Sequence, residues 1–469
     1  MLVLSPLRRP GVLLTLAIAA ALACIGLLSA TQLVGEDSKK GLLIAAGLVV
    51  APILAYLALR RPIVFPFAIY AAAIPFDNLL KTDAGGTATR LLAIFAALAI
   101  GLQLIVRRSA IAPSRSLLLW GGLIVWMGAT IFWAIDGDAA VAQFVRYLQL
   151  YMVFAVVSIY PIKSNDLKIL VGAVIAGACA ATLYGDYLFH NGQGAAIQRL
   201  VVTSGTSHID PNQFAAAVLM PFALTVMMFL RCKLSLTKVL LLGVVGILLT
   251  GFITSASRGG LLAAGLIMLF LFVRSRYKMQ VAVGGVAAAL MIAPSALIAR
   301  FAQVQSTGGA GRLDIWTSAA IAFKQHWIVG SGIGNFPYAY DQVYLLSFHQ
   351  SNHWHVVAHD LIAQSSVETG LIGLALVLLA WLSQFKVLNF IGPGEALYDL
   401  RIALQASIVG LFACALFVDV MWYKYLWLAF SVAALARNLA IQSQVEHEPG
   451  TVATRARVKL LYSRGASNA

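Results

Sequence analysis

Four arginines of this sequence lie in or beside apolar segments, where a charged side chain is costly. Arg146 falls inside the run QFVRYLQLYMVF, and Arg258 stands between two apolar runs. Arg199 and Arg312 border or lie in polar stretches. Charge at membrane depth usually faces a cavity or a partner, and guanidinium forks pair well with phosphate oxygens. We therefore expect an anion site, with a diphosphate as the favoured ligand. The alternatives are snorkelling to lipid headgroups or ion pairs with Asp77, Asp136, Asp210 or Asp314.

The sequence SRGG gives Arg258 the best local case for anion binding. This stretch comes at the predicted start of a helix, where unpaired backbone N–H groups and the positive end of the helix dipole favour an anion. Gly259 and Gly260 lack side chains and would let the backbone approach a bulky ligand. We therefore expect Arg258 to bind the anion.

Histidines are concentrated late in the chain, with five of the eight between residues 326 and 359. Imidazole titrates near neutral pH, which suits a general base. His359 has the favoured position because it stands where a long polar segment re-enters the membrane, just before the predicted helix DLIAQSSVETGLIGL. Asp360 is a good N-cap for that helix. His359 is therefore the candidate base, and a purely structural role of its ring is the alternative.

A metal site is the less favoured interpretation of the same histidines. His355 and His359 are four residues apart, so they would share a face if they lay on a helix. However, HVVAH lacks the glutamate that makes the zinc-protease motif work, and no third ligand is evident. The sequence therefore predicts no metal and no cofactor.

A glycine-rich stretch, GSGIGNF at residues 330–336, matches a dinucleotide-binding fingerprint in spacing. That motif needs a surrounding βαβ unit, which is not predicted here. We interpret the stretch as a flexible turn. Glu368 falls inside the apolar segment that follows, where we expect it to make a hydrogen bond in helix packing.

Composition places these motifs in a membrane protein. Of the 469 residues, 61% are hydrophobic and only 11% are charged, which is more apolar surface than a soluble domain can hide. The net charge of +15 comes from basic residues that punctuate apolar segments, so it indicates topology and not nucleic-acid binding. The sequence predicts an all-α polytopic protein with about 12–14 transmembrane helices.

The basic residues also predict the orientation of the chain. With the N-terminus in the cytoplasm, alternate crossings place most Lys and Arg residues on the inner side. Both termini are then cytoplasmic, and the first apolar run is a retained helix and not a cleaved leader. The predicted divisions are N-terminal transmembrane helices (1–299), a large outer loop with short helices (300–359), C-terminal transmembrane helices (360–441) and a cytoplasmic tail (442–469).

Five motifs follow one another at characteristic spacing. They are HIDPNQFA at 208–215, SRGG at 257–260, GGAGRLDIW at 308–316, GSGIGNF at 330–336 and AHDLIAQSSVETGLIGL at 358–374. This order resembles the O-antigen ligase and O-antigen polymerase superfamily. The resemblance covers roughly residues 200–385 in motifs, and the helical layout of the whole chain is also similar.

The resemblance implies an inverting, metal-independent glycosyl transfer at the periplasmic face of the bacterial inner membrane. The donor would be a glycan on undecaprenyl diphosphate, and the acceptor of a ligase would be a lipid A-core hydroxyl. By resemblance, His359 would activate that hydroxyl, while Arg258 and Arg312 would bind the donor diphosphate with help from Arg199. Cations fixed there lower the barrier because charge builds on the leaving diphosphate. One departure is Asp360, where the family usually has Asn: a helix cap survives this change, but an amide-specific contact to the donor does not.

Two related activities use the same donor and stay open: O-antigen polymerase, and protein O-oligosaccharyltransferase, whose acceptor is a Ser or Thr side chain. A transporter is disfavoured, because the charged residues gather at the outer boundary and no repeat symmetry is evident. The expected partners are the lipid-linked glycan donor, the lipid A-core acceptor and membrane lipids, without nucleic acid.

Overall fold

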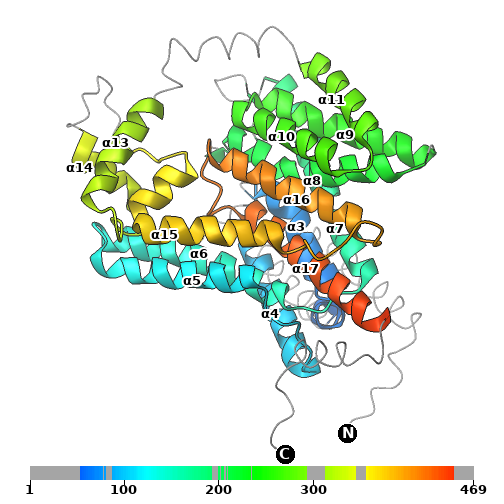
Figure 1. Cartoon of the computed structure of the whole chain (residues 1–469), viewed down its shortest axis with the longest axis horizontal. Coiled ribbons are helices and arrows are strands. Elements are labelled where there is room, and N and C mark those ends of the chain that lie inside the picture. The colour runs from blue at the N-terminus through cyan, green and yellow to red at the C-terminus, as the bar shows by residue number, and fades with distance from the viewer. Residues whose placement is uncertain are drawn as a thin grey trace, which may run out of the picture.

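The computed structural model describes residues 53–77, 79–80, 87–192, 199–200, 202–204, 207–208, 210–233, 235–292, 312–344 and 355–447. Within these ranges the chain is helical, apart from a hairpin of two antiparallel two-residue strands, β1 (Thr203–Ser204) and β2 (Ser207–His208). The predicted all-α class is confirmed (Figure 1).

The helices follow the apolar runs of the sequence. In chain order they are η2 (Ile63–Phe67), α3 (Ala68–Ala73), η3 (Ile74–Phe76), α4 (Ala88–Arg107), α5 (Arg115–Ala129), η4 (Thr130–Trp133), α6 (Gly137–Ser158), α7 (Ser164–His190), α8 (Pro211–Arg231), α9 (Leu236–Ser255), α10 (Arg258–Arg274), α11 (Lys278–Ile292), α13 (Arg312–Gln325), α14 (Phe336–Tyr344), α15 (Leu361–Lys386), α16 (Tyr398–Ala415) and α17 (Lys424–His447).

Nine helices in the described ranges are long and apolar enough to cross a membrane. A tenth is obtained if the pair Ile53–Arg60 and Ile63–Phe76, which bends by 101°, counts as one span. Helix α10, with 17 residues, falls just short of the necessary length. The predicted first span near residues 11–30 lies outside the described ranges, so the total of about 12–14 spans stays a prediction for the whole chain.

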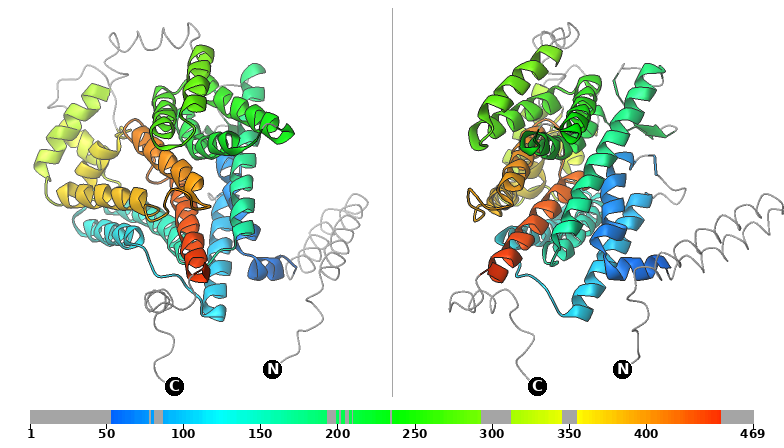
Figure 2. Two further views of the ribbon diagram at one scale, coloured as in Figure 1. Left: turned by 45° about the vertical axis from the view of Figure 1, so that its right-hand side comes forward. Right: turned by 90° about the vertical axis from the view of Figure 1, so that its right-hand side faces the viewer.

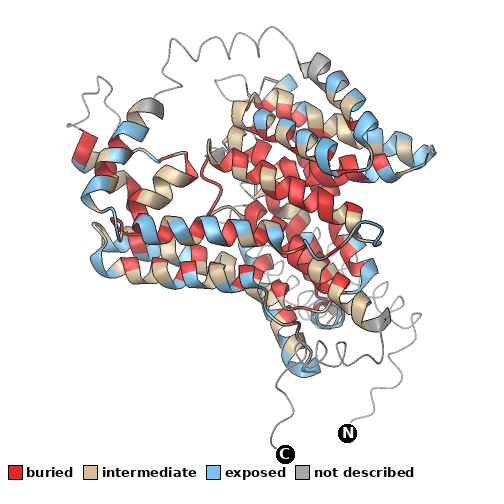
Figure 3. Cartoon of the chain, in the orientation of Figure 1, coloured by how far each residue is buried: buried red, intermediate tan, exposed pale blue. Residues whose placement is uncertain are grey.

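Helices α8, α16 and α17 form the interior of the bundle and are its most buried spans (Figure 3). Trp120 of α5 lies in an aromatic cluster with Trp381 of α15 and with Trp427 and Phe430 of α17, at centroid distances of 5.2–6.3 Å. By contrast, only 17% of the α9 span is buried, and Leu236, Val239, Leu240 and Leu242 are exposed. A helix that is apolar all round and stays exposed in the folded chain is expected to face lipid.

Helix α15 is broken at Gly370, where φ is 67° and ψ is −169°. The segment 327–336 docks into this break. Ser331 and Gly332 donate their backbone N–H groups to the carbonyl oxygens of Val367 and Glu368, at 2.8 and 2.9 Å. Leu371 donates in turn to Trp327 O at 2.8 Å. We call this pairing of residues 327–336 with residues 367–372 the glycine clamp.

The glycine clamp corrects the prediction of a flexible turn at residues 330–336. Ser331, Ile333 and Asn335 are at most 1% exposed. A Cβ at Gly330 would lie 2.4 Å from the backbone of Glu368, and one at Gly370 would lie 2.2 Å from Ile328 O. The glycines are therefore needed for close packing of two backbones and not for mobility.

The clamp also joins the long segment before α15 to the α5–α6 connection. Ile333 N donates to Thr130 Oγ1 at 3.0 Å, and Asp136 N donates to Asn335 Oδ1 at 2.6 Å. Short helices α13 and α14 of this segment lie beside the first half of α15, away from α9–α11 (Figures 1 and 2). The structure thus contains the short helices predicted for this segment and fixes them to the membrane-spanning part.

Replacing Gly370 by Ala should destabilise the protein by about 3 kcal/mol or more, because the φ/ψ values belong to a region that only glycine adopts and because the added Cβ would clash with Ile328 O. Thermal unfolding of the purified protein in detergent measures this loss. Gly172→Ala is the matched control, since nothing lies within 4 Å of that position. An equal effect of the two substitutions would contradict the clamp.

Candidate functional site

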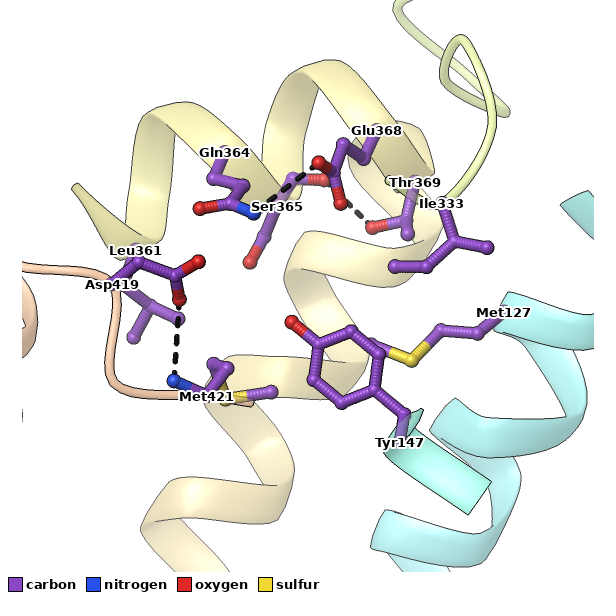
Figure 4. A pocket seen from close by; sticks show the side chains of 10 residues that line it. All are labelled: Met127, Tyr147, Ile333, Leu361, Gln364, Ser365, Glu368, Thr369, Asp419 and Met421. Carbon is purple, nitrogen blue, oxygen red and sulfur yellow. Dashed lines mark hydrogen bonds between the residues drawn. The ribbon is translucent and has the colours of Figure 1, made fainter. Parts of the chain in front are cut away.

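A small polar pocket lies between α5, α6, the glycine clamp, the first half of α15 and the connection from α16 to α17 (Figure 4). Its volume of about 10 Å³ is the room of one water molecule. It is lined by Met127, Tyr147, Ile333, Leu361, Gln364, Ser365, Glu368, Thr369, Asp419 and Met421. Six of these ten side chains are polar, although the helices that enclose the pocket are mostly apolar.

Two carboxyls are buried in the walls of this pocket. Glu368 is 2% exposed and accepts hydrogen bonds from Gln364 Nε2 at 3.2 Å and Phe336 N at 3.4 Å. The predicted packing hydrogen bonds of Glu368 are therefore present. Asp419 is 9% exposed and accepts from Met421 N at 3.3 Å. Burial raises the pKa of Asp419 to about 6.

The connection 416–423 between α16 and α17, which we call the α16–α17 loop, was missed by sequence reasoning. It touches the pocket and two of the predicted anion-binding regions. Asp419 and Met421 line the pocket, Phe417 packs where a Cβ of Gly259 would lie, and the Trp422 ring lies under the Arg146 guanidinium at 5.6 Å. The available signal was the combination of one acidic residue with three aromatic residues in VDVMWYKY at residues 418–425.

Arg146 lies on α6 next to Tyr147 of the pocket, and its side chain is exposed. Besides the contact with Trp422, it donates to Gln143 Oε1 at 3.4 Å. Arg146 therefore stands at the edge of the pocket with a guanidinium that can reach solvent or a headgroup.

Arg199 and Arg258 meet at the turn from α9 to α10. Arg199 Nε donates to Ser255 O at 2.8 Å, and its Nη2 donates to Asn212 Oδ1 at 3.0 Å. Arg258 begins α10, as predicted, and Ser257 caps that helix by accepting from Gly260 N at 3.1 Å. The structure thus brings two predicted cations to one turn.

The role predicted for Gly259 and Gly260 is wrong. A Cβ at Gly259 would lie 2.9 Å from Phe417 Cβ, and one at Gly260 would lie 2.5 Å from Ala215 Cβ. The chain itself fills the space beside both glycines. Their small size serves the packing of α10 against α8 and the α16–α17 loop, and not the approach of a ligand.

Three of the four aspartates considered as partners for the arginines have other roles. Asp77 forms an ion pair with Lys424 Nζ at 2.6 Å. Asp136 caps α6 by accepting from Ala139 N at 2.7 Å, and Asp210 caps α8 by accepting from Asn212 N at 2.8 Å. The anion interpretation of the arginines stays a prediction.

His359 is half-buried and directly precedes α15. Asp360 caps this helix as predicted, accepting from Ala363 N at 2.7 Å. Arg312 is the first residue of α13, and its side chain lies outside the described part of the structure. The position of the Arg312 guanidinium relative to the other arginines is therefore untested.

The residues from His355 to His359 are not helical, so these two imidazoles do not share a helix face. Both residues have left-handed φ values, 56° and 49°. His355 instead pairs through Nδ1 with Asp341 Oδ2 at 2.6 Å and is more than half exposed. Within the described ranges, no group of three or more His, Cys, Asp or Glu side chains could hold a metal ion.

These features define a multi-span helical membrane protein with cations and buried acids gathered where several helices end. Residues 242–378 match the family model described as O-antigen ligase. Enzymes of this family transfer glycans from a lipid carrier. The match includes Arg258, Arg312 and His359, whereas Arg146, Arg199 and Asp419 fall outside it. No curated protein matches the chain.

Replacing Arg199 by Met should lower the free energy of unfolding by about 2 kcal/mol, since a charged donor is lost from Ser255 O at the end of α9. Thermal unfolding in detergent measures the change. Lys168→Met is the control, because Lys168 is exposed and its substitution should shift unfolding little. If Arg199→Met unfolds like the control, Arg199 does not hold this turn.

Proposed function

We propose that the protein is an O-antigen ligase, which transfers a glycan from undecaprenyl diphosphate to a lipid A-core hydroxyl. The match of residues 242–378 to the ligase family carries this proposal. The arrangement of Arg199 and Arg258 at one turn and of His359 at the start of α15 supports it. The reaction is inverting and needs neither a metal nor a cofactor.

In this proposal the arginines hold the donor diphosphate. Arg258 and Arg312 neutralise the charge that develops on the leaving group, and Arg199 and Arg146 assist them. A guanidinium offers several N–H donors in a rigid fork, which suits phosphate oxygens. Cations that are already fixed before the reaction need no reorganisation while charge develops, so they lower the barrier more than mobile ones.

His359 acts as the general base. Its ring takes the proton of the acceptor hydroxyl while the oxygen attacks the anomeric carbon of the donor, and the bond from that carbon to the diphosphate breaks. Its half-buried position just before α15 supports this role, because a base at such a boundary can meet a polar acceptor and a lipid-anchored donor.

The site faces the periplasm in this proposal, and both termini lie in the cytoplasm. The distribution of Lys and Arg between successive loops supports this orientation. The undecaprenyl chain stays among membrane lipids, while the diphosphate sits at helix ends near the surface.

Reconstitution with defined substrates tests the function. Purified protein in liposomes, supplied with an undecaprenyl-diphosphate glycan and lipid A-core, should yield the lipid A-linked glycan at a rate unchanged by EDTA. Polymerase activity would give a longer lipid-linked glycan from two donors, and a protein O-oligosaccharyltransferase would modify a Ser- or Thr-containing protein. Either of these products without the lipid A product would overturn the ligase assignment.

His359→Ala should lower the transfer rate by about 10²-fold or more, because general-base catalysis contributes on this scale. Donor binding and thermal unfolding should change little. His355→Ala is the matched control, since His355 lies four residues earlier, is exposed and pairs with Asp341. Near-normal turnover of the His359 variant would remove His359 from the mechanism.

A further inference from the structure

The Gln364 side chain lies between two buried carboxyls (Figure 4). Its Nε2 donates to Glu368 Oε1 at 3.2 Å, and its Oε1 faces the Asp419 carboxyl. Glu368 is 2% exposed and Asp419 9%. Within the described part of the chain, neither carboxyl has an ion pair with Lys or Arg.

The amide oxygen, Gln364 Oε1, is buried and accepts no hydrogen bond from a donor of the chain. An amide has one accepting end and one donating end, whereas an ionised carboxylate only accepts. Turning the amide around would place its oxygen against Glu368 instead of Asp419. In either orientation the oxygen faces a carboxyl, so it gains a partner only if that carboxyl carries a proton.

We propose that Glu368, Gln364 and Asp419 hold one proton among them and thereby form a hydrogen-bonded bridge from α15 to the α16–α17 loop. We call this the carboxyl–amide bridge. The proton is donated to Gln364 Oε1, which is buried and has no other donor. Without the proton, this oxygen would face a carboxylate oxygen with no hydrogen bond between them, which is unfavourable. Asp419 and Gln364 act as positioning residues. The positioning role of Asp419 and Gln364 in glycan transfer rests on the proposed function. The presence of the shared proton does not depend on that function.

The bridge connects the two parts of the proposed catalytic machinery. Gln364 lies in the first turn of α15, immediately after His359 and the Asp360 cap. At the other end, the α16–α17 loop carries Trp422, which lies under Arg146. Loss of the bridge would therefore allow Arg146 and the α16–α17 loop to move relative to His359.

The bridge should depend on pH, and the sign follows from the burial of Asp419. Burial favours the neutral carboxyl, and the pKa of Asp419 is raised to about 6. Asp419 therefore carries a proton below about pH 6 and loses it as the pH rises through this value. Among the described residues, the titratable groups that interact electrostatically with Asp419 are Tyr147 from α6, Glu368 from α15, Tyr423 just before α17 and Tyr425 in its first turn. Arg146 from α6 and Asp210 before α8 act on the same tyrosines.

Infrared difference spectra of the purified protein between about pH 5 and about pH 8 detect the proton directly. The natural chain should lose one protonated-carboxyl band as the pH rises. The band should be absent from the double variant Asp419→Asn, Glu368→Gln at every pH. Asp399→Asn is the matched control and should keep the band, because Asp399 is 4% exposed but paired with Arg231 and Arg276. If the double variant still shows this band and loses it between these pH values, the proposal of a shared proton is overturned.

Transfer kinetics test the positioning role. Asp419→Ala removes the bridge and should raise the donor KM about tenfold below about pH 6, an effect of about 1.4 kcal/mol, and should raise it little at about pH 8, where the natural chain has already lost the proton. Asp419→Asn supplies a permanent N–H donor, so its donor KM should vary less with pH than that of the natural chain. Equal pH profiles for Asp419→Asn and the natural chain would overturn this role. Absence of any transfer would instead count against the proposed function, and the infrared result would still stand.

Discussion

The break in α15 is the constraint on which the rest of the site depends. A helix that stops and restarts among membrane-spanning segments leaves backbone N–H and C=O groups that lipid cannot satisfy. The glycine clamp supplies partners for these groups from residues 327–332. Because the two backbones must approach within hydrogen-bonding distance, glycine is required at residues 330 and 370. The clamp therefore fixes the direction of the short half-helix that begins after His359.

The α16–α17 loop has a comparable role on the other side of the pocket. Phe417 packs against the start of α10, Asp419 enters the pocket and Trp422 supports Arg146. One short segment thus contacts elements that lie far apart in the sequence. In the proposed reaction the loop relates the cations, which hold the diphosphate, to the base, which directly precedes α15. This arrangement fixes charges before the reaction starts, which is the main source of electrostatic catalysis.

The chain uses two different solutions for buried carboxyls. Asp399 is surrounded by Arg231 and Arg276 and is compensated by charge. Glu368 and Asp419 have amide and backbone donors instead. A buried carboxyl without a cation is favoured in its neutral form, so the second pair is suited to holding a proton. Glu368 belongs to the same half-helix that begins after the proposed base, so this difference bears on the proposed reaction.

The sequence alone determined the all-helical membrane class, the start of α10 at Arg258 and the Asp360 cap, because hydropathy and capping are local properties. It also placed His359 at the start of a helix. The glycine clamp, the packing of Phe417 against Gly259 and the pocket of Glu368 and Asp419 were decided by tertiary structure. Each joins residues that are tens to more than a hundred positions apart, so no local pattern contains the contact. The roles predicted for the glycines at 259, 260 and 330–334 were wrong for this reason. A glycine in the sequence indicates that a side chain would not fit, and only the fold shows that other parts of the chain occupy that space.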